Sequence, residues 1–443
     1  MLTAFLRAFR TPDLRRKLLF TVFIIGVFRL GSQLPTPGVS EKAVNACLNL
    51  TNARGASASV LQLVNLFSGG ALLRLSVFAL GIMPYITASI ILQLLGVVIP
   101  RLEALRKEGQ SGQAKITQYT RYLTVGLAIL QSTGIVALAR SGQLQGLTGN
   151  TKCAGLIPNQ GIFTITTMVI CLTAGTAVIM WLGELITDRG VGNGMSLMIF
   201  TQVIAVIPGQ MYQIFKTKHT FVFGVVVLVG VAIIGFVAFM EQAQRRIPVQ
   251  YAKRMVGRKM YGGTSTYIPL KVNQAGVIPV IFGSSLLYIP GLAAQLFGGL
   301  GGAHPKAWAT WVETHLVRGD DPYYIAAFFV MIVFFTYFYV SITFNPTEVA
   351  DNMKKYGGFI PGIRPGRPTA EYLQYVLSRL TAPGSVYLGL IALIPMVAIG
   401  LVGASSQFPL GGTSILIAVG VGLDTVKQIE SQLQQRNYEG FLR

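Results

Sequence analysis

Long apolar runs separated by short polar stretches make up most of the chain. In the clearest run, residues 221–240, no charged side chain interrupts a segment that, as a helix, would cross the roughly 30 Å hydrocarbon core of a bilayer. The same pattern predicts ten membrane-spanning helices, at residues 18–34, 75–99, 119–139, 161–182, 190–209, 220–240, 273–297, 324–344, 385–403 and 412–430. Because the alternating ten-residue segments of a membrane β-barrel do not occur, we expect an all-α polytopic membrane protein.

Composition supports this fold class. The chain is 52% hydrophobic and 12% charged, with a mean hydropathy of +0.57. A soluble domain carries about twice that charged fraction. The first apolar run ends at Pro35-Thr36-Pro37 instead of at a small-residue cleavage site, so we expect it to remain in the membrane and not to be removed as a signal peptide.

The placement of lysine and arginine predicts the orientation of the ten spans. With the N-terminus in the cytoplasm, the cytoplasmic segments hold 26 of these residues and the outer segments hold 9, with Arg29 inside the first span. This asymmetry follows the positive-inside rule and places both termini in the cytoplasm. It also explains the net charge of +20 without a nucleic acid partner.

A short sequence pattern occurs twice, 195 residues apart. Glycine, proline, isoleucine and serine recur in register, at Gly81/Gly276, Pro84/Pro279, Ile86/Ile281 and Ser89/Ser284. Both copies are predicted to lie in the middle of a hydrophobic helix and to bend it. The alternative is that glycine and proline are simply frequent in membrane helices.

The two copies lie in the second and seventh predicted spans, five positions apart in the series, so the second copy should run antiparallel to the first. This arrangement is typical of an inverted repeat with a working site between the halves. We expect an N-terminal half at residues 1–219 and a C-terminal half at residues 220–443.

Residues 60–73 form an apolar segment that is too short to cross the membrane. Near its end, Gly69-Gly70 is expected to be a flexible connection to the next helix. One interpretation is a half-helix that re-enters the membrane from outside, buried in protein or lining a cavity. The other is an amphipathic helix lying at the interface. The residues alone leave both open.

Two predicted cytoplasmic loops, residues 241–272 and 345–383, are long and basic. Topology accounts for their charge, but not for their length or for the stiff Pro361-Gly362-Ile363-Arg364-Pro365-Gly366 turn. Stiff turns that hold an arginine away from the membrane indicate a docking surface for a partner.

The residue types needed for catalysis do not converge in the sequence. No zinc, phosphate-loop or nucleophile-elbow motif occurs, and the three histidines form no constellation, so we expect neither an enzyme nor a cofactor. Cys47 and Cys153 both lie on the predicted outer side, where a disulfide is conceivable. A secondary transporter would share inverted repeats, but it should place charged groups near its midplane.

These residues add up to a resemblance. The chain closely resembles the SecY/Sec61-alpha family of protein-translocation channels along almost its whole length. The matching stretches are residues 65–71, 78–89, 107–109, 118–122, 181–184, 189–190, 192–194, 270–273, 275–279, 361–366 and 411–414. The resemblance implies the central channel of a bacterial plasma-membrane translocase, which passes unfolded secretory proteins across and releases membrane helices sideways.

The resemblance also implies roles for particular residues. Segment 60–74 would be a plug that closes the resting channel from outside, with Asn65, Phe67, Ser68, Gly69 and Gly70 as its matching residues. A pore ring of apolar side chains would consist of Ile82, Ile86, Val191, Met195, Ile281 and Ile417. A lateral gate between the second and seventh spans would carry Thr87, Gln131 and Asn273.

Partners are likewise implied. Arg245, Arg246, Arg258, Lys259 and Arg364 would lie on the loops that engage the ribosome or the motor ATPase SecA. SecE would clamp both halves and SecG would be an accessory subunit. Signal-bearing preproteins and membrane lipid would be the other binding partners.

Overall fold

The structure is a computed structural model that describes residues 9, 11–40, 42–44, 68–72, 74–140, 157–158, 161–217, 220–251, 254–256, 259–261, 265–297, 306–317, 321–402 and 412–439. In these residues each of the ten predicted spans coincides with one helix. In chain order they are α2 (Pro12–Gly31), α5 (Met83–Val98), α7 (Gln110–Arg140), α8 (Ile162–Arg189), α9 (Gly194–Thr217), α10 (Thr220–Gln242), α11 (Ile278–Phe297), α13 (Pro322–Thr343), α15 (Arg367–Val402) and α16 (Gly412–Glu439).

Not every helix is long and apolar enough to cross a membrane alone. Among the described residues, four segments meet that criterion: Ile162–Arg189, Phe223–Gln242, Pro322–Lys355 and Arg367–Ile394. A fifth is the pair formed by α5 and the short α6 (Pro100–Lys107), which is bent by 100°. The apolar parts of α9 (Gly194–Gly209) and α11 (Ile278–Gly291) are shorter than this criterion requires.

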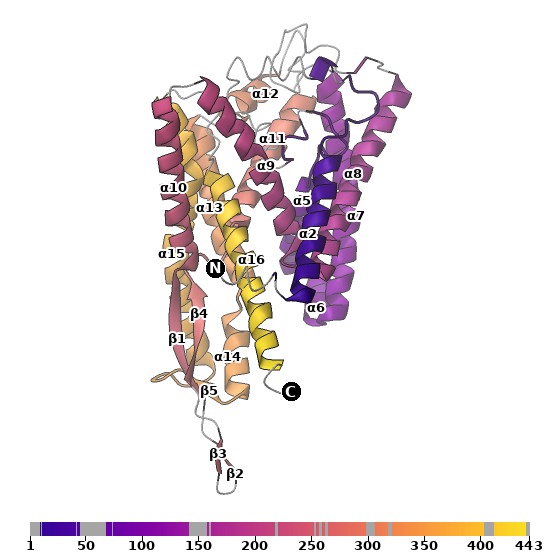
Figure 1. The fold of residues 1–443 in the computed structure, drawn as a ribbon. Coiled ribbons are helices and arrows are strands. Elements are labelled where there is room, and N and C mark those ends of the chain that lie inside the picture. The colour runs from indigo at the N-terminus through magenta and orange to yellow at the C-terminus, as the bar shows by residue number, and fades with distance from the viewer. Residues whose placement is uncertain are drawn as a thin grey trace.

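The helices form two groups, one from each half of the chain. In Figure 1, α2, α5, α7 and α8 stand on the right, and α10, α13, α15 and α16 stand on the left. Between them leans α9, which packs against α8 in one group and against α16 in the other. The centre of the molecule is therefore a contact between two helical bodies.

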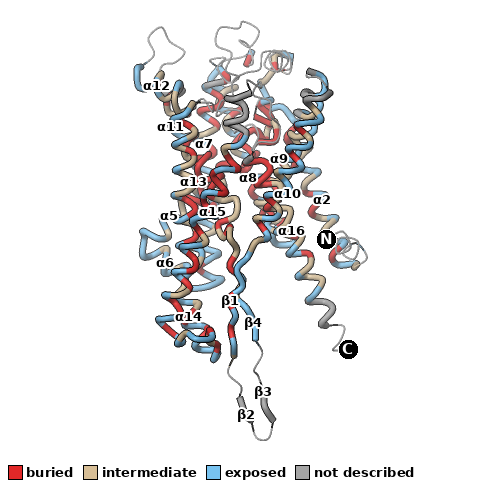
Figure 2. The backbone as a smooth tube through the Cα atoms, turned by 90° about the vertical axis from the view of Figure 1, so that its left-hand side faces the viewer, coloured by how far each residue is buried: buried red, intermediate tan, exposed pale blue. Residues whose placement is uncertain are grey.

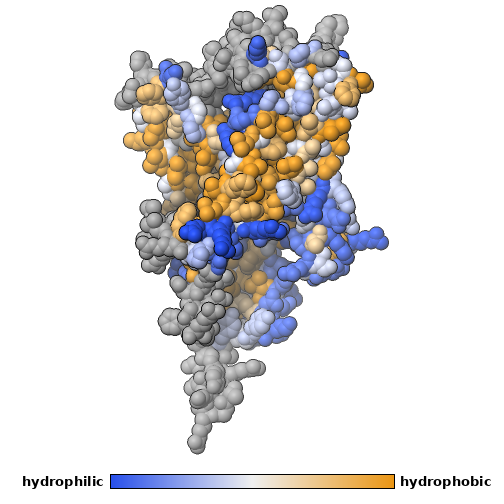
Figure 3. Space-filling view, turned by 45° about the vertical axis from the view of Figure 1, so that its right-hand side comes forward, coloured by the Kyte–Doolittle hydropathy of each residue, from blue (hydrophilic) through white to orange (hydrophobic). Residues whose placement is uncertain are grey.

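The surface matches a membrane environment. Buried residues gather along the inner sides of the helices (Figure 2), and a broad hydrophobic band covers the upper part of the face in Figure 3, above a hydrophilic region. Large apolar side chains point outward: Phe163 is 84% exposed and Phe239 is 72% exposed. Exposure of so many large apolar groups is stable when lipid, and not water, covers them.

The two long basic loops contribute to a small sheet that the hydropathy pattern did not predict. A long hairpin extends below the helices in Figures 1 and 2. A strand of the second loop pairs antiparallel with the hairpin, Gln250 opposite Phe359, which joins loops about a hundred residues apart. The strands are β1 (Gln244–Tyr251), β4 (Ser265–Lys271) and β5 (Gly358–Phe359) in the order β4-β1-β5, with β2 (Arg254–Val256) paired to β3 (Lys259–Tyr261) farther along the hairpin.

This sheet has its own apolar core. Ile247, Val249 and Leu270 of the hairpin pack against Met353 and Leu373 from the following helices. The first of these helices, α14 (Pro346–Lys355), begins at Asn345, whose side chain accepts hydrogen bonds from the first-turn amides of Thr347 and Glu348. The basic loops therefore form a folded platform.

At the opposite end of the molecule lie α12 (Ala307–Val312) and the π-helical turn η1 (Glu313–Val317).

Candidate functional site

The repeated sequence pattern marks the starts of two helices, and not their middles. Gly81 and Gly276 both have left-handed backbones, with φ of +57° and +62°, which glycine adopts readily. Helices α5 and α11 then begin two residues later, so Pro84 and Pro279 are each the second helical residue. A proline there costs no hydrogen bond, because first-turn amides have no helical acceptor. The predicted bend in mid-helix is therefore wrong.

The two helices leave their starts in opposite directions. Helix α5 leads into α6 at the lower side of the molecule, whereas α11 leads toward α12 at the top (Figure 2). Both starts lie at the contact between the two helical groups, where α5 and α11 touch. The antiparallel arrangement expected from the sequence is thus present around the paired glycines.

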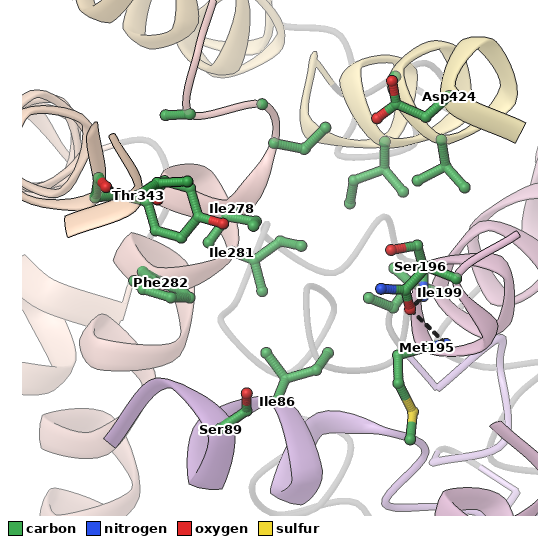
Figure 4. Close-up of a pocket in the computed structure, with 18 of the residues that line it drawn as sticks. Ile86, Ser89, Met195, Ser196, Ile199, Ile278, Ile281, Phe282, Thr343 and Asp424 are labelled. Atoms are coloured by element: carbon green, nitrogen blue, oxygen red, sulfur yellow. Dashed lines mark hydrogen bonds between the residues drawn. The ribbon is translucent and has the colours of Figure 1, made fainter. Parts of the chain in front are cut away.

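An apolar cluster fills the space between these starts. Ile82, Ile281 and Ile417 are buried within it, and the half-buried Ile86 and Met195 pack against it. Figure 4 shows Ile86 and Ile281 facing one another across a cavity, with Met195 on a third side. The structure brings these five expected ring residues together from α9, α16 and the beginnings of α5 and α11.

The sixth expected ring residue lies elsewhere. Val191 is 1% exposed, but it packs with Leu14 and Ile429 in a separate cluster. Ile199, one helical turn after Met195 on α9, instead lies in the ring cluster and lines the cavity. The four-residue spacing from Met195 was the available sequence signal for it.

A cavity of about 410 Å³ adjoins the cluster. Ile86, Ile281 and Ile417 contribute apolar side chains to its lining, and Glu241 and Asp424 contribute charged ones. Figure 4 shows Asp424 on the opposite side of the cavity from Ile86. The cavity therefore has a mixed lining of apolar and polar side chains.

The seam between α5 and α11 is closed by apolar contacts. Ile90 of α5 packs with Phe282 of α11 and Phe335 of α13 in one buried cluster. The rings of Phe282 and Phe335 meet edge to face, with centroids 5.6 Å apart. Helix α11 also touches α7. The sequence analysis missed these aromatic and aliphatic seam residues, because their spacing resembles ordinary core packing.

Of the three expected gate residues, Thr87 and Asn273 form hydrogen bonds within their own half of the chain, and Gln131 lies on α7. The Oγ1 atom of Thr87 donates to the carbonyl oxygen of Met83, 3.0 Å away in the same helix. The Nδ2 atom of Asn273 donates to the Oε1 atom of Glu241 at 2.5 Å. Gln131 lies half-buried on α7. Among the described hydrogen bonds, none joins these three side chains to one another.

The described part of the plug segment, residues 68–72 and 74, forms a tight turn. Gly69 and Gly70 have φ of +65° and +86°, and the Oγ atom of Ser68 accepts a hydrogen bond from the amide of Leu72 at 3.0 Å. Arg29 of α2 donates from Nη1 to the carbonyl oxygen of Gly69 at 3.0 Å. The arginine inside the first span therefore binds the glycine turn directly. Asn65 and Phe67 lie outside the described residues.

Three of the basic residues expected to dock partners, Arg245, Arg246 and Arg364, lie on the folded platform. Arg245 and Arg246 are exposed on β1, and the Arg246 guanidinium stacks over the Tyr267 ring at 4.9 Å. Arg364 is exposed at the turn between β5 and α15. Lys259 is in β3, and Arg258 lies outside the described residues.

The described residues contain no cluster of metal-binding side chains. Cys171 on α8 is a free, partly buried thiol, while Cys47 and Cys153 lie outside the described residues. What converges at the centre is an apolar constriction, a cavity on one side of it and a glycine turn held by an arginine. An apolar constriction of this kind can exclude water and ions while its side chains adapt to a passing chain.

Comparisons with known proteins agree with this geometry. A sequence model of the SecY family matches residues 76–426. The protein translocase subunit SecY of Streptomyces galbus is 66% identical over 449 residues, and that of Mycobacterium tuberculosis (strain ATCC 25618 / H37Rv) is 60% identical over 447 residues. Each alignment covers 100% of this chain and 100% of the relative.

Solved structures share the fold at low sequence identity. A structure described as a protein conducting channel has a TM-score of 0.61 at 17% identity, covering 94% of this chain and 91% of that chain. Sec61 in the canine ribosome-channel complex has a TM-score of 0.58 at 16% identity, with the same coverage.

Proposed function

We propose a mechanism from the premise that the chain belongs to the SecY family of protein translocase subunits. Its function is to form a protein-conducting membrane channel within a complex of several subunits, and it is not a catalytic enzyme. The assignments of individual residues, partners and orientation that follow are our proposal.

The observation that carries the mechanism is the apolar cluster between the starts of α5 and α11. We assign the pore ring to Ile82, Ile86, Met195, Ile281 and Ile417, with Ile199 in place of Val191. Branched and thioether side chains can repack around different client residues at low cost. Because the ring is apolar, water leaves it when no chain fills it, and ions do not pass.

The lateral gate is the seam between α5 and α11. Ile90 and Phe282 hold it closed by packing, and Asn273 supports it by binding Glu241 at the end of α10. The packing of these side chains is stable in the resting channel. A hydrophobic helix of a protein in transit can replace the same apolar contacts. The seam can therefore release a membrane helix sideways into lipid, and α5 and α11 form both this gate and part of the ring.

The plug is the segment 60–74, and the Arg29 hydrogen bond to Gly69 keeps it seated in the resting state. A buried or half-buried hydrogen bond from a charged donor contributes about 1.5–3 kcal/mol. That is enough to favour the closed state, and it is small enough for an arriving client chain to overcome.

The two halves, residues 1–219 and 220–443, act as the bodies that move apart. Their grouping in Figure 1 and the opposite directions of α5 and α11 support this division. The small membrane subunit SecE would hold the halves together on the outside of the helices, and SecG would associate at the edge. Signal-bearing preproteins would enter between the halves.

The platform of β1, β4 and α14 is the docking surface for the motor ATPase SecA or the ribosome. Exposed Arg245, Arg246 and Arg364 give it a basic surface that suits an acidic protein patch or RNA phosphates. The excess of lysine and arginine on this side supports a cytoplasmic position for the platform and for both termini, in a bacterial cell whose plasma membrane holds the channel.

A protein-conducting channel explains the centre better than a secondary transporter, because the described residues that meet in the cluster between the starts of α5 and α11 are apolar. The deciding experiment is reconstitution of the purified chain with a SecE partner in vesicles. Addition of SecA, ATP and a preprotein should move the preprotein into the vesicles. Uptake of a small solute down an ion gradient, with no preprotein import, would contradict the channel assignment.

A further inference from the structure

Gln202 on α9 is fully buried beside the plug and carries an unpartnered amide. Its exposed fraction is 0%, and within the described part of the chain neither Nε2 nor Oε1 has a hydrogen-bond partner. Buried amide groups in folded proteins almost always find partners, so this one requires a physical explanation.

The position of Gln202 suggests that explanation. Met195 and Ile199 of α9 line the cavity, and Gln202 follows Ile199 by three residues on the same side of the helix. It therefore continues the ring-facing stripe of α9 one turn beyond the constriction.

The glycine turn of the proposed plug lies next to the backbone of this residue. A Cβ atom placed on Gly69 would lie 3.3 Å from the Cα atom of Gln202 and 3.4 Å from its carbonyl oxygen. The same glycine accepts the hydrogen bond from Arg29. Arg29 and the backbone of Gln202 thus both lie against Gly69.

We propose that Gln202 biases the channel toward opening, because the seated plug buries an amide that plug displacement would expose to water. The inference rests on the plug assignment made above. Once the plug moves, the amide can bond to water or to the backbone of a chain in transit. Every peptide group except that of proline offers both a donor and an acceptor, so this contact suits any client sequence. Gln202 and Arg29, both next to Gly69, therefore have opposite effects on the seating of the plug.

Two substitutions of similar size test the proposal. Gln202→Met removes the polar group, and Gln202→Glu replaces it with a more strongly hydrated one. In vesicles that contain the complete translocase complex, Gln202→Met should lower resting ion conductance by roughly fivefold or more and slow preprotein import. Gln202→Glu should raise resting conductance.

The decisive result is that the two substitutions change the resting ion conductance in opposite directions. If Gln202 only packed, both substitutions would disturb the same contacts and both would raise leakage; that result, or wild-type conductance in both, overturns the proposal. If Gln202→Met does not accumulate in the membrane, Gln202→Leu carries the same expectation. The double variant Arg29→Gln with Gln202→Met should return toward wild-type leakage, since the two effects oppose each other.

Deletion of residues 60–73 separates this proposal from the plug assignment. Without the plug, the Gln202 substitutions should no longer change conductance. If the deletion itself does not leak, the plug assignment fails. If the deletion leaks while the Gln202 variants of the full chain match wild type, only the inference about Gln202 fails.

Discussion

Arg29 in the first membrane helix donates a hydrogen bond of 3.0 Å from its Nη1 atom to the carbonyl oxygen of Gly69, forty residues later in the plug segment. A charged side chain is costly inside a membrane span unless it faces protein and finds an acceptor. Here the acceptor is a backbone carbonyl in a turn of two left-handed glycines. In the plug mechanism proposed above, sealing of the resting channel therefore depends on this contact between α2 and the glycine turn.

Replacement of Arg29 should unseat the plug. Arg29→Gln removes a charged donor worth about 1.5–3 kcal/mol, so the open fraction at rest should rise by about tenfold or more. Single-channel recording in planar bilayers measures this fraction. The matched control is Arg15→Gln, because Arg15 is exposed on the same helix and lies outside the plug segment. Equal leakage from both variants would argue against the Arg29 contact.

The two plug glycines should differ in their tolerance of alanine. Both have positive φ, which costs an alanine about 1–2 kcal/mol. A Cβ on Gly69 would also crowd the backbone of Gln202 at 3.3 Å, whereas a Cβ on Gly70 meets nothing within 4 Å. Gly69→Ala should therefore leak more than Gly70→Ala in the same bilayer assay. The reverse order would show that the plug turn does not seat against α9.

A polar residue in the ring should relax selection of clients. Ile417 is 0% exposed in the ring cluster, and Ile417→Asn would place an amide there at a cost of about 1–3 kcal/mol to the closed state. We expect more import of preproteins with defective signal sequences, measured as protease-protected product. Val191→Asn is the control, because Val191 is equally buried in a separate cluster. Relaxed selection in the control instead would restore Val191 to the ring.

Cross-linking of the seam should block both routes through the channel. Ile90 and Phe282 lie in one cluster on opposite sides of the seam. Cysteines at both positions, joined by a short bifunctional thiol reagent with a reducible link, should stop preprotein import and membrane-helix release. Reduction should restore both. Each single cysteine, treated in the same way, controls for the native thiols. Full activity of the cross-linked pair would mean that the gate lies elsewhere.

Charge reversal on the platform should separate docking from channel assembly. Arg364 is exposed at the turn before α15, so Arg364→Glu should leave the fold intact and reduce SecA-driven import severalfold by repelling an acidic partner surface. Binding of SecA to vesicles, with import measured in parallel, checks this expectation. Arg101→Glu reverses another exposed arginine, on α6, and should change neither. Normal import by the Arg364 variant would remove this residue from the docking surface.

Much of the fold was predictable, because the hydrophobic effect acts on local composition. All ten apolar runs coincide with helices in the described residues. The sequence analysis erred where the same residue types serve two structural roles. Pro84 and Pro279 could bend a helix or begin one, and only the positive φ of the preceding glycines decides between them.

The platform sheet escaped prediction for a different reason. Strand β1 contains Arg245, Arg246 and Pro248, which do not resemble a buried strand, and its partner β5 has only two residues. Pairing between loops a hundred residues apart depends on the helices that bring them together. For the same reason, the seam contact of Ile90 with Phe282 carries no local signal.

The sequence by itself determined that the chain is a helical membrane protein, the family to which it belongs and the paired Gly-x-x-Pro positions, and it predicted an orientation. These properties follow from local composition and spacing, and hydropathy and charge placement report them directly. The tertiary structure alone decided that the paired glycines begin antiparallel helices, that Ile199 and not Val191 joins the central cluster, and that Arg29 binds Gly69 while Gln202 is left without a partner. Those facts depend on which residues come into contact between distant parts of the chain. A pattern of residues along the sequence does not contain the distances between residues in the folded protein.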